Sequence, residues 1–159
     1  MEYGSGSIGL FEQTLSEARK KTFEFDCGDL PLSEFDLGGV LYHANYFRVF
    51  ERAREALFAR RELPYHTLAN QGAHLAVLES RQHFIKPIHY GDNFKVNLWV
   101  SELKAASLRI NYELHLEKEN KLAHRAWMRM VYVEKKDVGE FKMRKFPHAM
   151  RAIFIELDC

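Results

Sequence analysis

The sequence predicts an α+β protein in which an antiparallel sheet of five strands wraps around one long central helix. The helix prediction rests on apolar residues that recur with a period of 3.6, starting at Tyr46 and stopping before Pro64. The sheet prediction rests on residues 94–100 and 108–116, where apolar and polar residues alternate strictly. A sheet that keeps one polar face must cover its other face, and this helix is the long amphipathic element available to do so.

Composition indicates one domain with a substantial core. The 159 residues are 47% hydrophobic and 13% aromatic. Lys and Arg number 23 against 22 Asp and Glu, so the net charge of +1 gives no general affinity for polyanions, and we expect no nucleic-acid partner. No stretch approaches the roughly 20 apolar residues of a transmembrane segment, and no secretory signal pattern opens the chain.

The cysteine content indicates a reducing compartment. Cys27 and Cys159 are the two cysteines, which is too few for a disulfide framework, so we expect a cytoplasmic protein. The eight histidines show no spacing typical of metal ligands, and we predict no metal and no cofactor. Cys27 falls in a predicted strand, where a cysteine is usually a small core residue rather than a nucleophile.

Residues 1–21 are predicted to be an N-terminal extension, and residues 22–159 the single domain. The extension opens with Gly4-Ser5-Gly6-Ser7, a flexible composition, and continues with the spacing of a short amphipathic helix. The domain opens with a strand at residues 22–26, on which Phe23 and Phe25 share one side.

The long helix is predicted to start near His43 to Asn45. Its apolar face comprises Phe47, Val49, Phe50, Ala53, Ala56 and Leu57. Its charged face comprises Arg48, Glu51, Arg52, Arg54, Glu55 and Arg60. Residues 66–72 then fit either a short helical turn or a loop.

The remaining strands follow in order. Residues 75–88 form a long extended stretch that Pro87 closes. The two alternating stretches come next, joined by a hairpin tip at residues 117–121 to a last strand at residues 122–133. That strand is apolar on both sides, which predicts burial on both faces or in an interface. Pro147 marks where a short turn of helix begins.

One carboxylate stands immediately before the long helix. Asp36 is followed by a turn containing Gly38 and Gly39, which places it close to the unpaired backbone N–H groups at the start of the helix. Such donors stabilise a developing negative oxygen, and a nearby carboxylate can act as general base or nucleophile. The structural alternative is that Asp36 only shapes the turn, as aspartate before glycine commonly does.

The motif around Asp36 adds a resemblance. Asp-x-Gly-Gly-Val-x-Tyr-His-Ala-Asn-Tyr, from Asp36 to Tyr46, is followed by Phe-Glu-Arg-Ala-Arg. This resembles the signature of the hotdog-fold acyl-CoA thioesterases, in particular the 4-hydroxybenzoyl-CoA thioesterase-like branch associated with the Tol-Pal system. The order of strands and helix resembles that family from about Phe23 to Val133. The resemblance implies the hotdog fold for the architecture predicted above.

The resemblance also implies roles for individual residues. Asp36 matches the catalytic carboxylate, and His43 lies at the helix start, where a backbone N–H polarises the thioester carbonyl and the imidazole is implicated. Support for the turn and the oxyanion is expected from Gly38, Gly39, Tyr42 and Asn45, and Asn45 is expected to cap the helix. The sequence departs from the branch at Leu32, where a tyrosine is usual, so any role of that tyrosine does not carry over.

The function that these features indicate is hydrolysis of an acyl thioester to free acid and CoA. Acyl carrier protein thioesters are an alternative substrate. The resemblance implies a homodimer or tetramer with sites completed across a two-fold axis, and cations that meet the CoA phosphates. Candidates for those cations are Arg81, Lys86, Arg109, Arg125 and Arg129. Two other functions stay open: a hotdog dehydratase of hydroxyacyl thioesters, and a non-catalytic acyl-binding or scaffold module.

Overall fold

The computed structural model describes residues 21–118 and 120–158. Its elements, in chain order, are β1 (Phe23–Asp26), η1 (Leu32–Glu34), η2 (His43–Asn45), α2 (Tyr46–Arg60), α3 (Tyr65–Asn70), β2 (Ala73–Phe84), β3 (Phe94–Ser101), β4 (Ser107–Leu116), β5 (Lys121–Asp137), β6 (Glu140–Met143) and α4 (His148–Ile155). The helix expected within residues 1–21 lies outside the described residues. No helix in the described part is both long and apolar enough to cross a bilayer.

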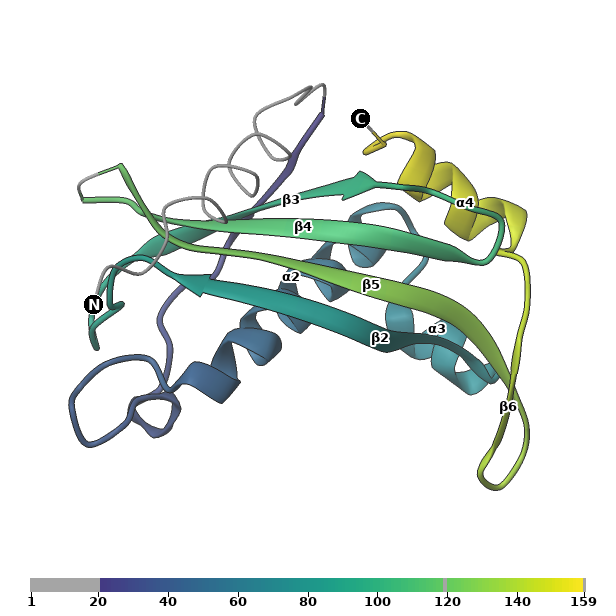
Figure 1. Ribbon diagram of the computed structural model, residues 1–159, viewed down its shortest axis with the longest axis horizontal. Helices are drawn as coiled ribbons and strands as arrows, with labels where there is room; N and C mark the ends of the chain where they lie inside the picture. The colour runs from purple at the N-terminus through teal and green to yellow at the C-terminus, as the bar shows by residue number, and fades with distance from the viewer. Residues whose placement is uncertain (1–20, 119, 159) are drawn as a thin grey trace, which may run out of the picture.

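The sheet is antiparallel and lies across α2 (Figure 1). Its strand order is β1-β3-β4-β5-β2, so the five predicted strands are present and β2 lies at one edge. The sheet also has a sixth strand, β6, which the sequence analysis missed. β6 pairs with the far end of β5, beyond Val131, where the pairing between β4 and β5 ends. Its sequence, Glu-Phe-Lys-Met, does alternate polar and apolar residues, but four residues make a short pattern and all four are exposed.

The long helix starts where the sequence predicted, because the turn η2 at His43–Asn45 leads directly into α2. Its buried residues are Tyr46, Val49, Phe50, Ala53, Leu57 and Phe58. Phe47 was assigned to the apolar face but is exposed, which means that the buried stripe is rotated toward Tyr46 and Phe58. Arg54 was assigned to the charged face, yet its guanidinium donates to the Tyr112 hydroxyl at 2.8 Å beneath the sheet.

The face of the sheet that turns away from α2 is less exposed than the alternation predicted. Asn111 and Glu113 were placed on a polar, half-buried face, and both are buried. Asn111 donates to the Ser101 hydroxyl at 2.9 Å, and Glu113 pairs with Arg125 and His115 at 3.1 Å each. Because these polar groups satisfy one another across the strands, they can be buried without unpaired charges.

The structure confirms the predictions for the last strand and for the segment after Pro147, and it decides the open choice at residues 66–72. β5 is buried on both faces from Met130 to Val133, as predicted, and α3 resolves the open choice at residues 66–72 in favour of a helix. Pro147 precedes α4, whose buried residues Met150, Ile153 and Phe154 close one end of the core.

Replacing Phe50 tests the packing of α2 against the sheet. Its ring is 0% exposed and stacks on Tyr112 with centroids 4.3 Å apart. Phe50→Ala should lower the free energy of unfolding by about 3–5 kcal/mol, because a large cavity is left in the core. Denaturant unfolding measures the loss. Phe141→Ala is the matched control, since Phe141 is 57% exposed on β6 and its truncation should cost far less. Equal losses for the two variants would contradict this packing.

Candidate active site

The loop before α2 is a tight turn that the Asp36 carboxylate closes. The Asp36 N–H donates to the Val40 carbonyl, and the Gly39 N–H donates to the Asp36 carbonyl, each at 2.9 Å. Oδ1 of Asp36 accepts the N–H groups of Gly38 at 2.8 Å and Val40 at 3.4 Å. Asp36 therefore shapes the turn, as the structural alternative predicted, and it uses one of its two carboxylate oxygens to do so.

Both glycines of the motif are needed for this turn. A Cβ on Gly38 would lie 3.1 Å from Oδ1 of Asp36, closer than most real contacts, so glycine lets the carboxylate approach the backbone. Gly39 has φ +75°, a conformation that side chains disfavour. The support expected from Gly38 and Gly39 is thus conformational.

The turn is held against the segment that follows β2. The Leu41 N–H donates to the Ile88 carbonyl at 2.8 Å, and Val40 forms an isolated bridge with His89. The rings of Phe35 and Tyr90 meet edge to face, with centroids 5.4 Å apart. These contacts bring Asp36 to the end of the edge strand.

The start of the helix differs in one respect from the prediction. Asn45 does not cap α2 with its side chain; instead its Nδ2 donates to the Glu34 carbonyl at 3.0 Å. The reason is that Asn45 already has helical backbone angles, whereas a capping side chain acts from extended backbone. Arg48 also pairs with Glu34, at 2.9 Å, so the η1 turn is tied to the first turn of α2. The Tyr42 ring packs on the His43 ring, with centroids 4.3 Å apart.

Asp36 and His43 line one cavity of about 330 Å³. Its complete lining is Asp36, Val40, Leu41, His43, Tyr46, Phe84, Ile85, Lys86 and Pro87. Five of these nine residues are apolar, and the polar ones come from the turn, the start of the helix and the segment after β2. Of the six predicted site residues, these two are the ones that line the cavity, while Gly38, Gly39, Tyr42 and Asn45 shape the backbone around it.

Aromatic rings form the wall that faces the sheet. Tyr46 and Phe84 meet edge to face at 5.1 Å, and the His124 ring lies 4.3 Å from Tyr46 and 4.7 Å from Phe84. Burial raises the pKa of Tyr46 to about 12, so its hydroxyl stays protonated at neutral pH. Burial, helped by the nearby charge of His83, lowers the pKa of His124 to about 3, so that imidazole stays neutral.

The sequence analysis missed Phe84, Gln82 and His124 as neighbours of the site. Phe84 falls within residues 75–88, which were predicted only as an extended stretch, and His124 is one of the eight histidines without ligand spacing. The signal in the sequence was weak because these residues lie about 40 positions apart along the chain. They meet because β2 and β5 pair with Phe84 directly opposite His124.

A second, larger hollow of about 860 Å³ adjoins the cavity. Its lining is Lys86, Pro87, His89, Gly91, Asp92, Asn93, Leu116, Glu117 and Lys118. It shares Lys86 and Pro87 with the smaller cavity, so Lys86 stands at the junction of the two.

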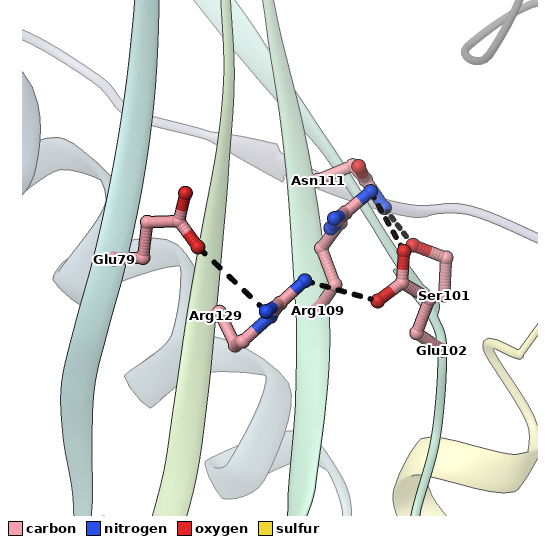
Figure 2. Close-up of polar contacts among 6 residues, drawn as sticks. All are labelled: Glu79, Ser101, Glu102, Arg109, Asn111 and Arg129. Carbon is pink, nitrogen blue, oxygen red and sulfur yellow. Dashed lines mark hydrogen bonds and ion pairs between the residues drawn. The ribbon is translucent and has the colours of Figure 1, made fainter.

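The other candidate cations lie elsewhere. Arg109 and Arg129 belong to a polar network on the face of the sheet away from α2 (Figure 2). Arg109 pairs with Glu102 at 2.8 Å and lies over the Trp127 ring, while Arg129 reaches Glu102 at 3.4 Å and Glu79 at 3.7 Å. Arg125 is held by Glu113, as described above. These three arginines are neutralised by carboxylates. Neither they nor Arg81, which lies on β2, line either cavity.

The alternative chemistries find little support in the geometry. Cys27 is buried, and Arg52 donates to its Sγ at 3.4 Å and to its carbonyl at 2.8 Å. Burial raises the pKa of the Cys27 thiol, which keeps it protonated and weakly nucleophilic. Within residues 21–118 and 120–158, no group of three His, Cys, Asp or Glu side chains is arranged to hold a metal ion.

The family described as the Thioesterase-like superfamily matches residues 30–154. Among curated relatives, a protein of Aquifex aeolicus is 33% identical over 79 residues, which are 50% of this chain and 62% of that protein. The acyl-CoA thioesterase YbgC of Haemophilus influenzae is 29% identical over 123 residues, 77% of this chain and 87% of that protein.

A solved structure supports the fold. The 1,4-dihydroxy-2-naphthoyl-CoA thioesterase Slr0204 from Synechocystis superposes with a TM-score of 0.77 and 22% identity, over 86% of this chain and 98% of that chain. The expected hotdog architecture and the expected class of enzyme, a thioester hydrolase, are therefore confirmed at the level of the family. By its sequence and its hotdog fold, the chain belongs to the thioesterase-like superfamily.

Proposed function

We propose that this protein hydrolyses acyl-CoA thioesters to the free acid and CoA. The observation that carries the proposal is that Asp36 and His43, at the start of α2, line one cavity together with apolar side chains. The apolar side chains suit an acyl chain, and the polar groups of Asp36 and His43 suit the thioester carbonyl. Assignment to the Tol-Pal-associated branch, a cytoplasmic location and use of acyl carrier protein thioesters stay predictions.

Asp36 has a free oxygen for the chemistry. Oδ1 is engaged by backbone N–H groups, and Oδ2 has no protein partner among the described residues. In one route Oδ2 takes a proton from water, which attacks the carbonyl carbon; in the other Oδ2 attacks that carbon itself and water then cleaves the mixed anhydride. In both routes the C–S bond breaks, CoA leaves as the thiolate and is protonated to the thiol, and one water is consumed.

The start of α2 supplies the electrostatic part of catalysis. Backbone N–H groups at His43 precede a 15-residue helix and carry the positive end of its dipole. Such donors stabilise the oxyanion that forms when the carbonyl is attacked, and loss of one typically costs about 3 kcal/mol in the barrier. We assign to the His43 imidazole, which packs beside Tyr42 and lines the cavity, the role of assisting the departing thiolate.

CoA itself is larger than the 330 Å³ cavity. We place its nucleotide in the adjoining hollow, with Lys86 at the junction meeting the phosphates. Of the five candidate cations named in the sequence analysis, Lys86 is the one that lines the cavity within a single subunit. The dehydratase and the non-catalytic binding module are the competing functions, and the first experiment below separates them.

Asp36→Asn should lower thioester hydrolysis by at least about 100-fold, because the amide is neither base nor nucleophile. Release of free thiol from short-chain, long-chain and aromatic acyl-CoAs measures it. Asp26→Asn is the matched control: Oδ1 of Asp26 accepts the Gly28 N–H at 2.9 Å in the same i to i+2 geometry, outside the cavity. Undiminished turnover in Asp36→Asn would refute the mechanism, enoyl products would indicate a dehydratase, and binding without turnover would indicate a binding module.

Lys86→Gln should raise the KM for acyl-CoA about tenfold and leave kcat nearly unchanged, because the lost charge contacts phosphates rather than the reacting carbonyl. The same acyl group on N-acetylcysteamine, which lacks the nucleotide, should show no change. Lys142→Gln on β6 is the control for loss of a surface charge. An equal effect on both thioesters would contradict the phosphate contact.

We further propose a homodimer built on the edge strand β2. Val77 and Leu78 are exposed along this edge, and the pairing with β5 shifts register there. A long apolar edge strand pairs readily with a second copy. Sedimentation should give a dimer at micromolar concentration. Leu78→Lys should produce monomers with reduced activity, whereas Val138→Lys, at an exposed turn on the other side of β5, should not. A monomeric wild type would contradict the dimer.

A further inference from the structure

Two buried polar atoms near the cavity have no hydrogen-bond partner among the described residues. They are Nδ1 of His124 and Nε2 of Gln82. The two side chains are hydrogen-bonded to each other, with Nε2 of His124 2.8 Å from Oε1 of Gln82. Because an unpaired buried polar atom costs free energy, each such atom in a folded protein calls for an explanation.

The pair leaves one acceptor and at least one N–H donor unpaired, whichever way its protons are assigned. If His124 donates from Nε2 to the Gln82 oxygen, its Nδ1 is left as an acceptor and the Gln82 amide N–H as a donor. If the Gln82 amide is turned over and donates to Nε2, its oxygen is left as an acceptor and the His124 Nδ1–H as a donor. In either case the complementary group is one that both donates and accepts.

The pair lies directly behind the wall of the acyl cavity. His124 is 0% exposed, and its ring contacts Tyr46 and Phe84, both of which line the cavity. Gln82 lies two residues before Phe84 on β2, so the two side chains share a face of the sheet. Neither Gln82 nor His124 lines the cavity itself, and Phe84, which is 50% exposed, is the side chain that has to turn aside for an acyl group to reach them.

We propose that Gln82 and His124 form the polar inner end of the acyl pocket and select acyl groups that carry a hydroxyl. This inference rests on the proposed function. A hydroxyl donates and accepts at once, as the pair requires, and it is uncharged. A carboxylate only accepts and an ammonium only donates, and each would bring an unpaired charge into an apolar wall. An acyl group without a polar end would leave both atoms of the pair unpaired.

The experiment compares matched substrates on the full-length protein. kcat/KM is measured for phenylacetyl-CoA and 4-hydroxyphenylacetyl-CoA, and for hexanoyl-CoA and 6-hydroxyhexanoyl-CoA. The wild type should favour the hydroxylated member of at least one couple by tenfold or more, since a site built to bind a hydroxyl rejects the analogue lacking it. Gln82→Met and His124→Phe should each bring that ratio close to one, by lowering kcat/KM for the hydroxylated substrate.

Matched variants separate this inference from a structural role. Gln71→Leu, at the exposed end of α3, should leave the ratio as in the wild type. Gln82→Met keeps the side-chain length, so it serves if His124→Phe does not fold, as judged by circular dichroism. Ratios near one in the wild type, or unchanged in Gln82→Met, would overturn the hydroxyl selection while the thioesterase proposal stands. Failure to turn over any acyl-CoA would instead overturn the proposed function.

Discussion

Burial of one face of α2 beneath the sheet is the constraint on which the rest of the structure depends. Phe50, Ala53 and Phe58 are fully buried, and the sheet is the element that covers them (Figure 1). Because this packing fixes the helix axis, it also fixes where the first turn of α2 emerges. The emerging end carries the His43 backbone and lies beside Phe84 at the end of β2. Packing and chemistry are thus joined through the position of a single helix end.

The turn around Asp36 shows how one side chain can hold a turn and still offer an oxygen for the proposed chemistry. Its Oδ1 closes the turn with two backbone N–H groups, and those bonds orient the carboxylate. A carboxylate held in this way loses little further freedom when a thioester arrives, which favours a well-positioned base or nucleophile. The structural and catalytic interpretations of Asp36 therefore do not compete, since the turn geometry is what presents Oδ2.

Charge on the sheet is arranged differently from charge at the cavity. On the face away from α2, arginines are matched by carboxylates, and Figure 2 shows this for Arg109 and Arg129 with Glu102 and Glu79. These pairs let polar residues lie between strands without unpaired charge. At the cavity, Asp36, His43 and Lys86 instead lie among apolar and aromatic side chains.

Local pattern in the sequence determined the long helix, its start at His43–Asn45, the five main strands and the Asp36 turn, because periodicity and glycine placement act over short stretches of chain. Local pattern could not determine where the buried face of the helix ends, so Phe47 and Arg54 were misassigned. It also could not determine that the Asn45 side chain donates to the Glu34 carbonyl rather than capping the helix. It also missed β6, because an alternation of only four residues is too short to be distinctive. Only the tertiary structure brought Phe84 into the cavity wall, placed Gln82 and His124 behind that wall, and kept the four candidate arginines away from it. Those outcomes depend on strand register, which pairs residues about 40 positions apart and leaves no trace in local spacing.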